Sequence, residues 1–222
     1  MNRFINALLL FILFPTLALS IFVGFDLPIE SLHTTGALMP HKKIVFLSLG
    51  LVLLIIALRR TVRRWMGMNM VLKQDRFKWN QPAGTERRKR IWVYTVMEGV
   101  VFLSVGIGLY SVTPFAWMPS LAFAIVFLDN MFFLLMGRWK NGFRIGITSK
   151  AVIMADRDVQ LVYFSGLRKV SIHQDSIYFD YINDLQLHFP IDAIDPLERD
   201  DFFKHLSAQL DRDRVFITTK RS

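Results

Sequence analysis

The sequence predicts an α-helical membrane bundle of four transmembrane helices, followed by a small, mostly β domain. Three observations support this fold class. The hydrophobic residues, 53% of the 222-residue chain, are gathered into long runs instead of being spread at helix or strand periodicity. Positive charge is concentrated between two of these runs. Beyond residue 137 the chain changes to short alternating runs that carry both signs of charge.

Four apolar runs account for the membrane domain, which we place at residues 1–137. A helix needs about 20 apolar residues to cross roughly 30 Å of hydrocarbon. The second run is short, and it spans only if Lys42, Lys43 and Arg59 extend their charged ends to the two interfaces. The predicted spans are residues 4–25, 44–58, 91–112 and 115–137.

The distribution of charge predicts the orientation. Residues 59–90, expected to form a basic loop, contain eleven Lys and Arg against two acids. Because positive residues stay on the cytoplasmic side, this loop is expected inside, and an even number of spans places both termini there too. The predicted location is therefore the cell (inner) membrane. An alternative is that the first run is a cleaved signal peptide, which leaves the orientation of the later spans unchanged.

The basic loop interleaves cations with aromatic and aliphatic residues, a composition that suits a segment in the lipid headgroup region. Each cation near an anionic surface contributes about 1 kcal/mol of attraction. The alternative is that these charges only determine topology. Nucleic acid is not expected as a partner, because no motif that reads bases accompanies the charge. The predicted headgroup contacts are Arg59, Arg60, Arg63, Arg64, Trp65, Arg87, Arg88, Lys89 and Arg90.

Two carboxylates lie inside the predicted spans at matching depth. Glu98 in the third span and Asp129 in the fourth both fall roughly 10–12 Å below the inner interface. Asn130 follows Asp129 and completes a candidate intramembrane polar site. Such residues face the bundle interior and find partners. They predict either a proton or cation site or a structural role, as helix-to-helix hydrogen bonds or as pairs with arginines of the basic loop.

Small residues in the third span predict close helix packing. Gly99 and Gly106 are seven residues apart and share a face, and Ser104 with Gly108 forms a small-xxx-small pair. We expect packing within the bundle, with homo-oligomerisation as the alternative.

Residues 138–222 predict a cytoplasmic β domain. Alternating runs bounded by turn residues indicate five or six strands. A closing helix is expected over residues 196–210, with Asp195 as its cap and Pro196 as its first residue. The expected strands begin near Phe143, Ala151, Val159, Arg168, Ile177 and Leu185.

Within this domain, three stretches resemble the bacterial pleckstrin-homology-like (PH-like) domains that are appended to membrane helices. They are residues 146–153, 167–172 and 187–191, and the resemblance covers about 70 of the 222 residues. This domain is short by one strand relative to that family. The resemblance implies a β-barrel platform with a scaffold role, and it transfers no catalytic residues.

The sequence contains no cysteine, and its histidines have no metal-ligand spacing, so we expect neither a metal nor another cofactor. An enzyme is not expected, because no nucleophile and base are paired. The predicted function is a membrane scaffold or regulatory protein whose PH-like domain engages lipid headgroups or a partner protein. The alternative is a small proton- or cation-coupled transporter or channel component that uses Glu98 and Asp129.

Overall fold

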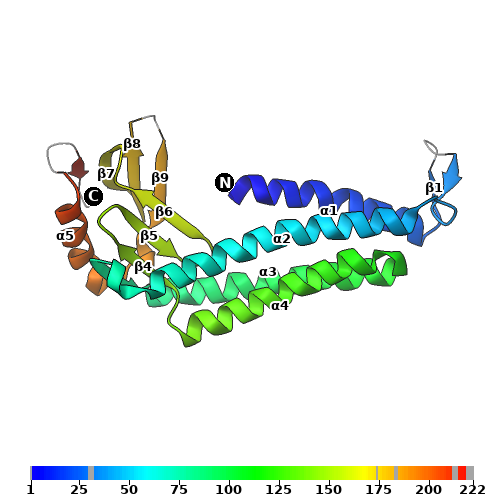
Figure 1. The fold of residues 1–222 in the computed structure, drawn as a ribbon, viewed down its shortest axis with the longest axis horizontal. Coiled ribbons are helices and arrows are strands. Elements are labelled where there is room, and N and C mark those ends of the chain that lie inside the picture. The colour runs from blue at the N-terminus through cyan, green and yellow to red at the C-terminus, as the bar shows by residue number, and fades with distance from the viewer. Residues whose placement is uncertain (1, 30–32, 174, 183–184, 212–214, 219–222) are drawn as a thin grey trace. The chain divides into compact units, whose positions relative to one another are not determined.

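The chain forms two compact units that alternate along the sequence (Figure 1). The computed structural model describes the chain except residues 1, 30–32, 174, 183–184, 212–214 and 219–222, with side chains described from residue 11 onward. The helical unit comprises residues 1–62 and 95–132, and the β unit comprises residues 63–94 and 133–222. The β unit therefore includes chain segments on both sides of the predicted boundary at residue 137.

Among the residues that the structure describes, three helices are long and apolar enough to cross a membrane, which indicates a membrane protein. They are α2 (Lys42–Leu72), α3 (Thr85–Val112) and α4 (Trp117–Trp139), the last preceded by the short helix η3 (Pro114–Ala116). The first predicted span corresponds to α1 (Asn2–Gly24). Within its described side chains the apolar stretch runs only over Phe11–Gly24, so a fourth crossing stays a prediction.

Helix α2 differs from the predicted short span and basic loop. It continues through Arg59 and Arg60 to Leu72, while α3 already begins at Thr85. Most of residues 59–90 is therefore helical. The reason is that a helix satisfies its own backbone groups, so it need not end where its side chains change from apolar to charged. Arg and Met are also good helix formers.

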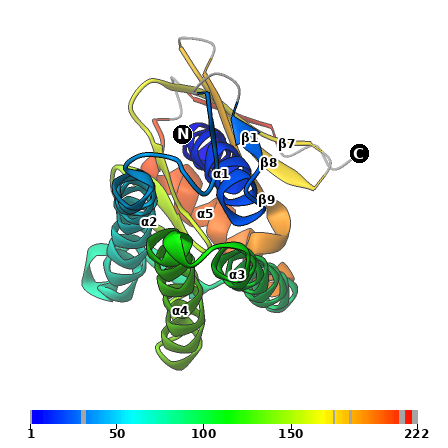
Figure 2. The same cartoon turned by 90° about the vertical axis from the view of Figure 1, so that its right-hand side faces the viewer.

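The helical unit is held together by apolar side chains from all four helices. Phe46 and Leu53 of α2, Leu109 of α3 and Phe123 of α4 are buried, and Val23 of α1 belongs to the same cluster. Figure 2 shows α2, α3 and α4 end-on, with α4 between the other two. A two-stranded ribbon, β1 (Pro28–Ile29) and β2 (Thr34–Thr35), lies between α1 and α2 in the chain.

Small residues set the approach of α3 to α4, as the sequence predicted. A Cβ at Gly99 would come within 3.2 Å of the Phe127 ring, and one at Gly106 within 3.1 Å of the Ser120 carbonyl oxygen. Gly108, in contrast, faces open space and Ser104 is exposed. Thus the Gly99 and Gly106 face packs within the bundle.

Two open four-stranded sheets form the β unit, with strand orders β3-β4-β5-β6 and β10-β7-β8-β9. All six predicted strands are present, and β3 and β10 are additional. β10 pairs with β7 in parallel, whereas the other neighbours are antiparallel. The strands are β3 (Trp79–Pro82), β4 (Arg144–Ile147), β5 (Ala151–Ala155), β6 (Val159–Tyr163), β7 (Leu167–His173), β8 (Ser176–Tyr181), β9 (Gln186–Pro190) and β10 (Phe216–Thr218).

The C-terminal helix closes the core of the β unit. The predicted helix corresponds to a first turn, η5 (Pro196–Glu198), followed by α5 (Arg199–Gln209). Asp195 caps it by accepting a hydrogen bond from the Leu197 backbone N–H. Phe202 and Leu206 of α5 are fully buried, and Phe202 contacts the edge of Trp79 in β3 with ring centroids 5.2 Å apart.

Two short helices border the sheets, η2 (Gln74–Arg76) before β3 and η4 (Ile191–Ala193) after β9.

Polar contacts fix β3 to its neighbours in the β unit. Asn80 donates to the carbonyl of Val71, at the end of α2, over 2.8 Å. Its side-chain oxygen accepts from Nε of Arg144 in β4, also over 2.8 Å. Burial lowers the pKa of the Arg144 guanidinium, so this cation depends on the oxygens that Asn80 supplies.

Candidate functional site

The predicted intramembrane carboxylates have partners on adjacent residues of α2. Glu98 of α3 forms an ion pair with Arg60. Asp129 of α4 accepts a hydrogen bond from the Thr61 hydroxyl over 2.8 Å. Both carboxylates therefore contact the same turn of α2, which connects the three helices at one level of the helical unit.

The side chains around Glu98 and Asp129 are largely, but not completely, buried. The Arg60 and Glu98 side chains are 17% and 20% exposed, and Asn130 is fully buried beside the close approach of α3 to α4. Removing two charges from water is costly, and pairing them recovers part of that cost. The geometry thus matches the expectation that a carboxylate of the bundle reaches an arginine of the basic segment.

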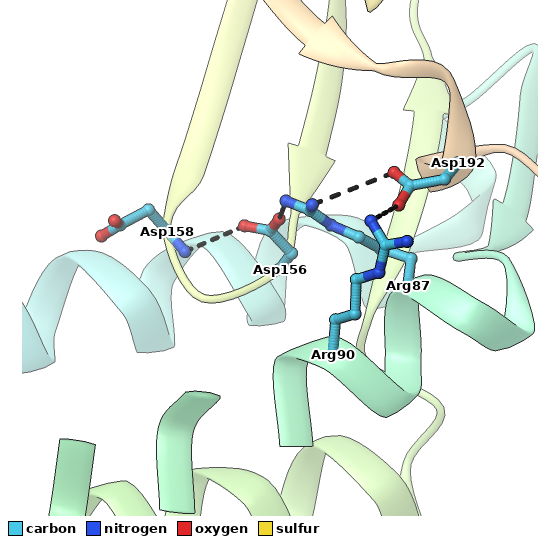
Figure 3. Close-up of polar contacts among 5 residues, drawn as sticks. All are labelled: Arg87, Arg90, Asp156, Asp158 and Asp192. Atoms are coloured by element: carbon cyan, nitrogen blue, oxygen red, sulfur yellow. Dashed lines mark hydrogen bonds and ion pairs between the residues drawn. The ribbon is translucent and has the colours of Figure 1, made fainter. Parts of the chain in front are cut away.

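Within the β unit, two arginines in the first turns of α3 bind residues that follow the two sheets (Figure 3). Arg87 donates to Asp156 over 2.5 Å and lies 3.9 Å from Asp192, while Arg90 contacts Asp192 at 2.8 Å. Asp156 follows β5 of one sheet, and Asp192 lies in η4, directly after β9 of the other. One helix face therefore connects the ends of both sheets.

The buried carboxylate of Asp156 anchors this contact. Its side chain is 6% exposed, and its second oxygen accepts the backbone N–H of Asp158 over 3.1 Å, which closes the turn between β5 and β6 (Figure 3). An ionised carboxylate this buried needs such partners. Arg87 therefore neutralises a charge that the turn between β5 and β6 would otherwise bury alone.

The intervening residues of α3 face a different surface. Residues three apart share a helix face, as Arg87 and Arg90 do, and the two residues between them turn away. Arg88 and Lys89 line an open cavity of about 670 Å³, which we call the α3–α4 groove. Its full lining is Pro82, Thr85, Arg88, Lys89, Trp92, Val93, Leu134, Gly137, Arg138, Asn141 and Phe143.

The remaining residues that were predicted to contact lipid headgroups differ in how deeply they are buried. Arg64 is buried with its guanidinium carbon 4.5 Å from the centre of the Phe133 ring, and Trp65 meets the same ring edge-on at 5.6 Å. Arg59 is exposed and Arg63 is half-buried. Four of the predicted cations, Arg60, Arg64, Arg87 and Arg90, thus bind within the protein.

Comparison with protein families, with curated proteins and with solved structures finds no significant match to this chain. The candidate sites therefore depend on the geometry described above.

Sequence analysis did not assign Arg138, Trp92 and Asn141 to any site, although all three line the groove. One signal was available. Arg138 ends the fourth apolar run and Arg88 precedes the third, so an antiparallel pair of helices brings them to the same end.

Proposed function

We propose that this chain is a multi-pass membrane protein of scaffold or regulatory type. Its β unit is held at the cytoplasmic surface, where it engages lipid headgroups or a partner protein. In this proposal α1 is a fourth span and both termini are cytoplasmic.

The observation that carries the proposal is the origin of β3. This strand lies between α2 and α3 in the chain, yet it pairs with β4, which follows α4. Arg87 and Arg90 at the start of α3 also bind residues of both sheets, so the β unit is assembled from separated segments of the chain. A β unit that shares residues with the ends of the long helices suits a platform role better than a domain on a separate linker would.

The order of elements supports a PH-like platform. The meander β4 to β6, to which β3 adds an edge strand, precedes a three-stranded meander, β7 to β9, and a closing helix, α5. The sequence of the C-terminal region was short by one strand relative to the PH-like family, and β3 supplies a strand from outside that region.

Charge supports the orientation. The last turns of α2 and the first turns of α3 carry eight of the eleven cations of residues 59–90, and the other three lie between these helices. Such residues are retained on the cytoplasmic side of a membrane.

Photo-crosslinking in intact cells tests the scaffold role. Exposed apolar positions of the β unit, Ile182 at 60% and Phe216 at 75%, would carry the photoreactive residue, with the exposed Leu38 of the α1–α2 connection as the matched control. We expect a discrete adduct with one protein or with lipid at the β-unit positions and not at Leu38. A protein adduct should form again when the two purified proteins are mixed. Absence of any adduct at both β-unit positions would contradict the proposal.

The alternative function, a proton- or cation-coupled transporter component, is favoured by one observation, the convergence of Glu98 and Asp129 on α2. Proteoliposomes with a pH-sensitive dye inside separate the two functions. The scaffold predicts a proton flux equal to that of empty liposomes. A flux that Glu98→Gln or Asp129→Asn abolishes would support the transporter instead.

A further inference from the structure

The α3–α4 groove combines positive charge with an apolar wall. Arg88, Lys89 and Arg138 line it, and none of the described residues around it is acidic. Arg88 and Arg138 are exposed and form no ion pair with any described residue. Lys89 contacts Glu86 at 2.9 Å, but both side chains are more than two-thirds exposed, so this pair neutralises little of the charge.

The polarity of the groove changes along α3. Trp92 and Val93 lie one helical turn beyond Arg88 and Lys89, about 6 Å further into the apolar stretch. They are 52% and 45% exposed. The buried side chains of Leu134 and Phe143 extend this apolar wall. A ligand that fills the groove must therefore be anionic at one end and apolar at the other.

We infer that the α3–α4 groove binds one anionic phospholipid of the surrounding leaflet. Its phosphate contacts Arg88, Lys89 and Arg138, and the start of an acyl chain lies on Trp92 and Val93. The hydroxyl of Thr85 and the amide of Asn141 offer further hydrogen bonds at the polar end. A volume of about 670 Å³ is in the usual range for ligand cavities and holds the headgroup and the first part of the chains.

This inference rests on the proposed function, since it specifies which lipid headgroup the protein engages. Lipid binding in the groove and the scaffold function can nevertheless be disproved separately. Binding to a purified chain in detergent does not depend on membrane orientation or on a partner protein.

Native mass spectrometry of the full chain, titrated with dioleoyl phosphatidylglycerol or dioleoyl phosphatidylcholine, tests the inference. The variant R88Q/R138Q removes two cations from the groove. Its matched control, K73Q/K140Q, removes two exposed lysines that follow α2 and α4 and do not line the groove. A third variant, V93W, fills the apolar wall and leaves the charges in place. Thermal unfolding checks that all of them fold.

We expect the wild type to prefer phosphatidylglycerol, and R88Q/R138Q to lose about tenfold in apparent affinity for it. V93W should also bind it more weakly, while K73Q/K140Q should bind as the wild type does. Glycerol phosphate, the headgroup without chains, should not displace the bound lipid.

Three results would overturn the inference. They are equal binding of the two lipids by the wild type, equal affinities of R88Q/R138Q and K73Q/K140Q, and displacement of the lipid by glycerol phosphate. The last result would assign the groove to a soluble anion.

Discussion

Two glycines of α3 that look alike in the sequence have different surroundings. A Cβ at Gly106 would come 3.1 Å from the Ser120 carbonyl oxygen and 3.2 Å from Cβ of Phe123, whereas nothing lies within 4 Å of one at Gly108. We expect Gly106→Leu to destabilise the helical unit by about 1–3 kcal/mol, because it separates α3 from α4. Gly108→Leu should have little effect. Thermal unfolding in detergent measures both, and equal shifts would contradict this packing.

A tyrosine of the β unit gives stability a dependence on pH. The Tyr181 hydroxyl donates to the carbonyl of Tyr163 over 2.6 Å, and burial raises the pKa of this phenol above its ordinary value of 10.0. A raised pKa in the folded state means that the contribution to stability is complete below pH 10 and is lost as the pH rises through the folded-state pKa.

Chemical denaturation of the wild type and of Tyr181→Phe, at neutral pH and at pH values above about 10, checks this expectation. The difference in unfolding free energy between the two proteins should change over that interval, because they differ only in this hydroxyl. A difference independent of pH would show that Tyr181 does not couple to folding.

Residue counting placed Glu98 and Asp129 at one depth and allowed arginines of the basic loop as partners, but it did not show which residues of α2 they contact. Arg60 and Thr61 were expected in a loop beyond a span that ended at residue 58. Only the continuation of α2 to Leu72 brings them into the bundle. Backbone hydrogen bonds allow a helix to continue beyond the end of its apolar run. A hydropathy pattern therefore shows where the apolar run ends, but not where the helix ends.

At the scale of elements, the sequence predicted five or six strands and a capped helix, and all six alternating runs form strands because each has a local signal. Alternation marks the strands, and the Asp195–Pro196 pair marks the helix start. β3 and β10 have no such signal. They contain four and three residues, β3 ends in proline, and each pairs with a strand distant in the chain. Whether such short segments form strands depends on pairing with a distant strand and not on their local sequence.

Asn80 connects β3 to α2 and β4, so its loss should affect the whole β unit. Asn80→Ala removes the hydrogen bond to the Val71 carbonyl and an acceptor of the largely buried Arg144. We expect a loss of about 1–3 kcal/mol in the free energy of unfolding. Gln81→Ala, one residue along the same strand, is the control, since no side-chain hydrogen bond of Gln81 occurs among the described residues.

Denaturant unfolding of the full chain, followed by the near-ultraviolet signal of Trp79 and its aromatic neighbours, measures the effect. If Asn80→Ala and Gln81→Ala unfold at the same denaturant concentration, the contacts of Asn80 do not stabilise β3.

At the scale of the whole molecule, the basic segment has two roles that composition alone does not separate. Some of its cations bind within the protein, as Arg60 binds Glu98 and Arg87 binds Asp156. Others, including Arg88, are exposed and line the α3–α4 groove, where our proposal places a lipid headgroup. In our account all of them lie on the cytoplasmic side, together with the sheets whose ends Arg87 and Arg90 bind.

Orientation is therefore the central claim, and labelling of single cysteines tests it most directly. The chain has no native cysteine, so Leu38→Cys and Leu197→Cys each create a unique target at positions that are 76% and 92% exposed. A membrane-impermeant maleimide applied to intact cells should label Leu38→Cys at once, and Leu197→Cys only after the cells are permeabilised. Labelling of Leu197→Cys in intact cells would place the β unit outside and contradict the account.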